Sequence, residues 1–285
     1  MESLKILKRR IKSVSSTMQL TKAMELVSAA KLRKAQTRLV SSRPYASKMQ
    51  TILENLSSAS TALTHPLFDK REVKHKGLVI ISSDRGLCGS YNVNIFRKAE
   101  EFLNQESKDK IKLVLIGKKG FYHYRRRPYE IRLKYIDLGG KLELTRTKEI
   151  TANLVNLFLS REVDEIFLLY TKFLTVTSYR VALEKFLNIE QPEDKEEKGY
   201  LQYIFEPSAE TLFDNLLPRY CLTRVQIALS EAFASEQGSR MIAMGAATRN
   251  AEEMIDQLTL FRNKARQAAI TKEMVEIASG VEALK

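Results

Sequence analysis

The hydrophobic positions at the start of the chain repeat with the spacing of a coiled coil. From Glu2 to Arg43 no glycine or proline occurs, and the repeat alternates between steps of three and four residues. Its members are Leu4, Leu7, Ile11, Val14, Met18 and Thr21. Pro44 interrupts the pattern, but its neighbours are good helix formers, so we expect a kink or a restart rather than an end. The pattern predicts a coiled-coil helix over residues 1–58.

The C-terminal end of the chain shows the same coiled-coil pattern as the N-terminal end. After Pro218 no proline occurs, and the sequence predicts one helix within a coiled-coil segment over residues 208–285. A seam again alternates by three and four, through Met241, Met244, Thr248, Ala251, Ile255 and Leu258. At about 1.5 Å per residue this helix would reach roughly 100 Å. Such a length is typical of a coiled coil or a similar extended object.

Between the helices the period changes. Short apolar runs at residues 77–83, 111–116 and 164–170 indicate buried strands, and helical patterns near 92–104 and 146–160 separate them. This alternation predicts a mostly parallel sheet covered on both faces, in a central α/β domain over residues 77–207 that follows a linker at 59–76. Segments near 173–187 and 199–206 flank the charged stretch QPEDKEEKG. They form either a hairpin with a solvated tip or a plain surface loop.

These elements define the fold class that the sequence predicts. It is α/β, with a long antiparallel coiled coil of N- and C-terminal helices and an inserted Rossmann-like, mostly parallel α/β domain. A compact inserted domain has its entry and exit close together, so the two helices leave it side by side. The C-terminal helix is the longer one, and its last residues, about 260–285, have no helix partner in the chain. Because this tip carries many apolar residues, we expect it to need a socket on another protein.

The apolar content and the cysteines of the chain limit the classes of protein to which it can belong. The 285 residues are 44% hydrophobic, which is enough for a sizeable core, and no run approaches the roughly 18 apolar residues of a membrane span. The N-terminus has no apolar signal segment. The two cysteines, Cys88 and Cys221, form no metal-binding pattern and no disulfide framework. We therefore expect a protein of a reducing compartment without a direct membrane span.

Positive charge is concentrated at one end of the chain. The net charge is +13, and residues 1–50 hold 12 Lys and Arg against 2 acidic residues. Three interpretations of this basic helix stay open: a solvated coiled-coil face, a face that meets acidic protein loops, or a nucleic-acid footprint. Aromatic residues are absent from it until Tyr45, which gives nucleic acid the least support.

The sequence offers no chemistry of its own. The loop SSDRGLCGS after the first strand has neither phosphate-binding pattern, and IGKKG at Gly117 to Gly120 indicates a short turn. Asp84 and Arg85 suggest a strand-end turn held by a local ion pair, or part of a subunit contact. The histidines show no ligand spacing; they are His65, His75 and His123. We expect no catalytic residue, no cofactor and no metal, which weakens one rival function, a Rossmann-type enzyme with helical arms. The other rival, a coiled-coil scaffold or nucleic-acid protein, stays open.

Four segments carry a resemblance to a known family. They are LKRRIKSVSSTMQLTKAMELVSAAKLRKAQ, SSDRGLCGSYN, FEPSAETLFDNLLPRY, and the run from ASEQGSRMIAMGAATRN to EIASGVEAL. The chain resembles the gamma subunits of F-type ATP synthases over essentially its whole length, most loosely in the middle. Two features depart from the family. Gly238 stands where a bulkier helix former is usual, which would soften the shaft locally, and the cysteine-bearing insert of the chloroplast form is missing, which argues against thiol control.

The resemblance implies a rotor shaft without an active site. Its coiled coil would enter a hexamer of alpha and beta subunits, and its α/β domain would meet the epsilon subunit and the c-ring. Rotation of the ion-driven ring would turn the shaft and drive the catalytic sites of beta through their conformations. The resemblance also implies a location on the cytoplasmic face of the bacterial inner membrane, peripheral through the complex.

The resemblance also assigns contact residues. Arg266, Gln267 and Thr271 match positions that contact the catch loop of beta. Met24 and Arg240 match positions facing acidic loops of beta. Phe205 and Glu206 match the part of the foot that meets the c-ring. Small residues at the tip would let it turn in an apolar sleeve; they are Ala265, Ala268 and Ala269.

Overall fold

The computed structural model describes residues 4–59, 65–139, 143–189 and 209–283. The chain divides into two compact units. The terminal unit comprises Met1–Ala29 and Arg240–Lys285, and the central unit comprises Ala30–Ser239. Helices α1 (Leu4–Ala59) and α5 (Ala209–Ala283) contribute residues to both units. The sequence suggests a different division, into four segments, and that division stays a prediction.

The central unit is built on a five-stranded sheet with the order β3-β2-β1-β4-β5. The first four strands are parallel, and β5 pairs antiparallel with β4. The strands are β1 (Lys76–Ile81), β2 (Ile111–Ile116), β3 (Glu130–Tyr135), β4 (Glu165–Phe173) and β5 (Tyr179–Leu187). The helices between them are α2 (Tyr91–Leu103), α3 (Lys118–Tyr124) and α4 (Leu144–Leu159), with short 3-10 turns η1 (Pro66–Phe68) and η2 (Lys108–Lys110). The predicted fold class is confirmed.

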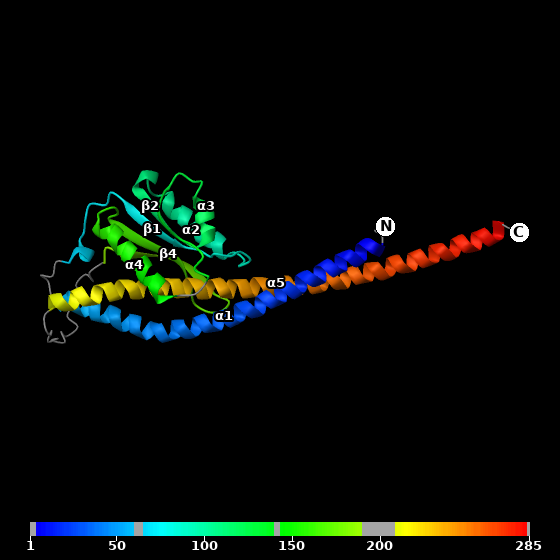
Figure 1. The fold of residues 1–285 in the computed structure, drawn as a ribbon, viewed down its shortest axis with the longest axis horizontal. Coiled ribbons are helices and arrows are strands. Elements are labelled where there is room, and N and C mark those ends of the chain that lie inside the picture. Colours follow the sequence, from blue (N-terminus) through cyan, green and yellow to red (C-terminus); the bar gives the residue numbers. More distant parts are fainter. Residues whose placement is uncertain (1–3, 60–64, 140–142, 190–208, 284–285) are drawn as a thin grey trace. The chain divides into compact units, whose positions relative to one another are not determined.

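Each face of the sheet carries its own core, because successive strand residues point to opposite sides. Leu78 and Ile80 of β1 pack with α2 and α3, whereas Val79 and Ile81 pack with α4 and with buried residues of α1 and α5. Figure 1 shows α2 and α3 over one face of the sheet and α4 with the N-terminal part of α5 on the other. The prediction of a sheet covered on both faces is therefore correct.

Three local predictions need correction. The segment predicted as one strand at 173–187 is broken by a turn between Phe173 and Tyr179, so the hairpin is formed by β4 and β5; residues 199–206 lie outside the described residues. The sequence pattern did not reveal β3, an edge strand on which charged residues alternate with partly buried ones. In IGKKG, Ile116 ends β2, Gly117 makes the turn and Lys118 to Gly120 begin helix α3, so the segment is more than a short turn.

Helix α1 continues through Pro44, as expected. Proline costs one backbone hydrogen bond inside a helix, but it does not end a helix whose neighbours are held by packing. Leu39 and Met49 on either side of it are buried, at 1% and 5% exposed. The tertiary contacts of α1 therefore hold the helix together where its backbone is weakest.

The conformation of Gly117, at the end of β2, generates a first prediction. Its φ is +97°, and an added Cβ would lie 2.2 Å from the carbonyl oxygen of Ser82. We expect Gly117→Ala to lower the free energy of unfolding by more than about 3 kcal/mol. Urea unfolding followed by circular dichroism measures this. Gly139→Ala is the matched control, because Gly139 has a φ of +60° with nothing within 4 Å of the added Cβ, and should cost about 1 kcal/mol. Equal losses in the two variants would contradict this explanation.

Candidate functional site

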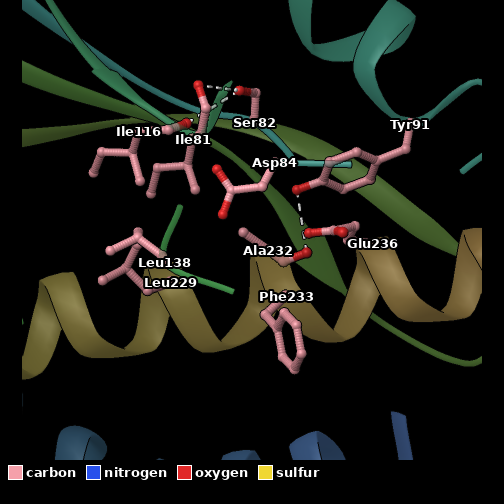
Figure 2. Close-up of a pocket in the computed structure, with 11 residues that line it drawn as sticks. Ile81, Ser82, Asp84, Tyr91, Ile116, Leu138, Leu229, Ala232, Phe233 and Glu236 are labelled. Atoms are coloured by element: carbon pink, nitrogen blue, oxygen red, sulfur yellow. Dashed lines mark hydrogen bonds between the residues drawn. The ribbon is translucent and has the colours of Figure 1, made fainter. Parts of the chain in front are cut away.

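The switch point of the sheet is the first place to look for a ligand site. The connection after β1 leads to β2 on one side, whereas the connection after β3 leads to β4 on the other side of β1. Ligands of open α/β sheets bind at the carboxyl ends of the strands where the order reverses in this way. A cavity of about 50 Å³ lies there, above residues Leu229 to Glu236 of α5 (Figure 2). Ligand sites usually have about 300–1,000 Å³. This cavity is too small for a nucleotide.

The carboxylate of Asp84 occupies the backbone donors at this switch point. It accepts hydrogen bonds from the backbone N–H groups of Lys118 and Asp137, both at 3.0 Å, and of Gly139 at 3.1 Å. Such clustered N–H groups are what a phosphate binds in nucleotide-binding relatives of this fold. Here they are satisfied by the chain itself. Asp84 thus holds the strand-end turn through hydrogen bonds from backbone N–H groups that are distant in the sequence. The ion pair or subunit contact expected for Asp84 and Arg85 stays a prediction.

The segment after β1, including the first residue of α2, connects the sheet to α5. The hydroxyl of Tyr91 donates to the carbonyl of Ala232 at 3.1 Å, as Figure 2 shows. Farther along α5, the hydroxyl of Ser239 donates to the carbonyl of Cys88 at 2.6 Å. Both contacts are buried. The motif SSDRGLCGSYN therefore has a mechanical role in this structure: it joins the sheet to the long C-terminal helix.

Asp84 gives the second prediction. In Asp84→Asn the amide nitrogen cannot accept a hydrogen bond, so one backbone N–H group loses its acceptor. The other backbone N–H groups then donate to a neutral amide oxygen instead of a charged carboxylate oxygen. We expect a loss of about 1–3 kcal/mol in the free energy of unfolding, measured by urea titration. The control is Asp109→Asn, at an exposed position in η2, which should change stability by less than about 0.5 kcal/mol. If both variants unfolded at the same urea concentration, the proposed role of the carboxylate would be wrong.

The paired helices of the terminal unit form the second candidate site. Thr21 of α1 and Thr248 of α5 share a buried hydrogen bond of 2.9 Å, and Glu25 lies beside Gly245. From the first pair to the second, the residue number rises on α1 and falls on α5, so the helices are antiparallel. The seam residues Leu7, Thr21 and Met244 are buried. The other predicted seam positions are buried or partly buried: Leu4, Ile11, Val14, Met18, Met241, Thr248, Ala251, Ile255 and Leu258. The predicted antiparallel seam is confirmed.

The C-terminal tip extends past the paired region. Continued along both helices, the Thr21–Thr248 register brings Leu4 level with Ala265. Helix α5 continues to Ala283, and residues 270–280 are all exposed. Large apolar side chains are among them: Ile270, Met274, Val275 and Ile277 are 44–68% exposed. Within the described residues, this stretch lacks a covering partner, as the sequence predicted.

Large apolar residues also stand outside the seam in the paired region, and the sequence pattern did not single them out. On α1 they are Ile6, Leu20, Leu26 and Val27, and on α5 they are Ile242, Met254, Leu260 and Phe261, all 41–64% exposed. Counting each apolar residue against the three-and-four spacing would have found them, because they fall between seam positions. Large apolar residues exposed at this many positions make the paired helices a candidate interaction surface.

The structure places the residues singled out in the sequence as follows. Gln267 and Thr271 are exposed one turn apart, and the Thr271 hydroxyl donates to the Gln267 carbonyl at 3.0 Å. Arg266 is exposed beside them. Met24 is partly buried, and Arg240 is only 6% exposed. Phe205 and Glu206 lie outside the described residues.

Other chemistry finds little support in the portion of the chain that the structure describes. Residues 4–59, 65–139, 143–189 and 209–283 contain no group of three or more potential metal ligands. Their helices include none that is long and apolar enough to cross a membrane. Both cysteines are buried thiols outside any disulfide, and burial raises the pKa of the Cys221 thiol to about 12. A thiol with such a pKa is a poor nucleophile at neutral pH.

Gly238 has a packing role that the sequence did not reveal. A Cβ at this position would lie 3.3 Å from the carbonyl oxygen of Val176, in the turn between β4 and β5. The glycine lets this turn approach α5 closely. The softening of the shaft expected at Gly238 stays a prediction, but the close approach already explains why a small residue stands here.

Comparison with known proteins gives one consistent result. A family model described as ATP synthase matches residues 3–284. The ATP synthase gamma chain of Protochlamydia amoebophila (strain UWE25) is 44% identical over 285 residues, covering 100% of both chains. The ATP synthase gamma chain of Moorella thermoacetica (strain ATCC 39073 / JCM 9320) is 47% identical over the same length, again with 100% of both chains covered.

Solved structures agree with these sequence relatives. A chain of the Tetrahymena thermophila mitochondrial ATP synthase central stalk and c-ring is similar with a TM-score of 0.62 and 27% identity, covering 80% of this chain and 99% of that one. A chain of the Euglena gracilis mitochondrial ATP synthase rotor, in rotational state 1, has a TM-score of 0.67 at 17% identity, covering 94% and 98%. The second likeness is one of fold.

Proposed function

The chain belongs to the family of ATP synthase gamma chains, and we propose that it is the central rotor shaft of an F-type ATP synthase. In this role it couples ion-driven rotation of the c-ring to the conformational cycle of the catalytic beta subunits, in ATP synthesis or hydrolysis. The chain is a subunit of the complex, and the chemistry takes place on beta. Its task is to carry torque and to present a different face to each catalytic site in turn.

The open surface of the terminal unit is the observation that supports this role best. One seam holds the two helices together, and the other faces expose large apolar residues. The tip beyond the seam is exposed all round. A lone helix of this composition is marginal in water, so it needs an enclosing partner. A sleeve made by a hexamer of alpha and beta subunits would cover these faces, and it would let the shaft turn if no contact interlocks permanently.

The contact residues belong to the same proposal. Arg266, Gln267 and Thr271 stand on one side of the exposed tip, where they can meet polar groups of beta. Their side chains suit transient contacts, because the planar guanidinium of arginine pairs readily with successive carboxylates. Met24 offers a smaller surface to the acidic loops of beta. Arg240 is buried within the chain and offers a partner the least surface of these residues.

The absence of an active site on this chain is also proposed, and the switch point supports it. The backbone donors that could hold a phosphate are taken by Asp84, and the cavity beside them is small. We infer that the chain binds no nucleotide or other cofactor. The rival function, a Rossmann-type enzyme with helical arms, has no ligand site at the place where such enzymes use one.

The remaining partners follow from the same role. The central α/β unit would meet the epsilon subunit and the c-ring, with Phe205 and Glu206 at the c-ring contact. Nucleic acid is not a proposed partner. We place the complex at the cytoplasmic face of the bacterial inner membrane, with this chain peripheral to the bilayer.

Hydrogen exchange of the tip tests the proposal. In the free chain, amides of residues 270–280 should exchange fast, because an exposed helix opens at little cost. After assembly with alpha and beta subunits the same amides should become strongly protected. Residues 244–251 are the internal control, since their buried seam should protect them in both states. Mass spectrometry of both states measures this.

Two results would overturn this role. If alpha and beta subunits did not co-purify with the tagged chain, the assembly itself would be wrong. If they did co-purify but the tip exchanged at the same rate in the free and assembled states, the hexamer would not enclose it.

A further inference from the structure

A large cavity lies between one stretch of α1 and the rest of the central unit. It has a volume of about 510 Å³ and is lined by residues of α1, β4, β5 and α5. A single water occupies about 30 Å³ of liquid, so this is a wide gap where a packed interface would be expected. The cavity is lined on the α1 side by Arg43, Ala46, Ser47 and Gln50. Leu39 before this stretch and Met49 within it are buried and anchor α1.

A charge pair bridges this gap. The guanidinium of Arg43 in α1 lies 3.3 Å from the Glu231 carboxylate of α5 and donates to the Phe173 carbonyl of β4 at 3.1 Å. The Glu231 side chain is 4% exposed, whereas that of Arg43 is 48% exposed. One guanidinium thus ties three elements together. Its partners come from distant regions of the sequence, so the pair is a tertiary link rather than a feature of helix α1 alone.

The position of the pair along α1 adds to its importance. The next residue is Pro44, which has no N–H to donate to the carbonyl of Val40, so the helix lacks one of its own hydrogen bonds here. Proline is also the commonest site of helix bending. Arg43 therefore holds α1 at the point where its backbone bends most easily, and next to the gap into which it could bend.

The pair is not explained by stability. Burial raises the pKa of Glu231, and the negative charge of Glu184 raises it further. The hydrogen bond and charge of Arg43 lower the pKa, as does the charge of Lys172, but they do not cancel the rise. One carboxylate oxygen, Oε2, has no hydrogen-bond partner among the residues that the structure describes. A carboxyl group with a raised folded pKa stabilises the fold at pH values below its unfolded pKa, and this contribution is lost as pH rises through the folded pKa. At neutral pH the ionised Glu231 is thus a cost to folding.

We propose that Arg43 and Glu231 form a charge clamp that fixes α1 against α5 across the cavity, so that torque applied to the central unit enters both helices together. This inference rests on the proposed rotor function. Without the clamp, α1 can bend at Pro44 into the gap, and this bending absorbs part of each rotation.

Other charged and titratable groups face the same gap: Lys172 and Tyr170 on β4, Glu184 on β5, and Tyr220 and Arg224 on α5. Lys172 and Arg224 both pair with Glu184, at 3.3 and 3.5 Å, which leaves Arg43 as the partner of Glu231.

The test measures the torsional stiffness of the shaft in the assembled complex. A bead is attached to the central unit through Asp109→Cys, an exposed position in a chain whose own cysteines are buried. The hexamer is fixed to a surface, and the angular fluctuation of the bead reports stiffness. The variants are Glu231→Gln, Arg43→Gln and the double variant. Arg38→Gln, an exposed arginine one turn earlier in α1, is the matched control.

The clamp predicts three results. Each single variant widens the angular fluctuation, the double variant widens it no further than either single one because they remove the same contact, and Arg38→Gln leaves it unchanged. Thermal unfolding of the free Glu231→Gln chain at neutral pH occurs at the same or a higher temperature than that of the original chain. As pH falls from neutral into the acid range, protonation of Glu231 lowers stiffness in the original chain and leaves Glu231→Gln unaffected.

Three other outcomes would overturn the clamp. They are unchanged fluctuation in both single variants, additive effects in the double variant, or a strong loss of thermal stability in Glu231→Gln, which would make the pair merely structural. In each of these the complex still assembles and the proposed function stands. Failure of the original chain to assemble with alpha and beta subunits would instead refute the proposed function itself.

Discussion

The burial of α5 against the sheet is the interaction on which the rest of the structure depends. Within the central unit this helix has no exposed residue from Tyr220 to Ser239, and its apolar stripe of Leu217, Cys221, Val225 and Ala228 is 0–1% exposed. A helix stretch without an exposed side lies inside a protein, and here the rest of the central unit provides that interior. Tyr91, the first residue of α2, adds a directed hydrogen bond to this packing. The helix is thereby a fixed component of the α/β unit instead of an appendage to it.

The same helix has the opposite character in the terminal unit. There it buries a single seam against α1, and beyond the seam it has no cover from the described residues. One continuous element is thus locked at one end and open at the other. This asymmetry suits a rotor shaft. The shaft needs fixed packing in the part that receives torque and contacts that can exchange in the part that delivers torque to its partners. The charge clamp at Arg43 extends the firm hold to α1.

The sequence predicted those features that follow from periodicity. The seams through Leu7 and Met244 and the parallel core strands repeat at fixed spacings, and burial in the structure matches them. Features that depend on contacts between residues distant in the sequence could not be predicted from the sequence pattern. Asp84 gave no local sign that it would accept three backbone N–H groups, and Glu231 looked like any charged residue on a helix. The edge strand β3 was missed because it is only half buried, and its alternation is weak beside that of the core strands.

A rotor shaft must turn inside its hexamer of alpha and beta subunits, and direct observation of rotation tests whether this chain does so. The hexamer is assembled with the Asp109→Cys chain, fixed to a surface, and supplied with ATP while a bead on the central unit is followed in a microscope. Because three beta subunits surround the shaft in turn, we expect the bead to rotate in one direction with three equal pauses per revolution. A hexamer that hydrolyses ATP while its bead only fluctuates about one angle would contradict the rotor function.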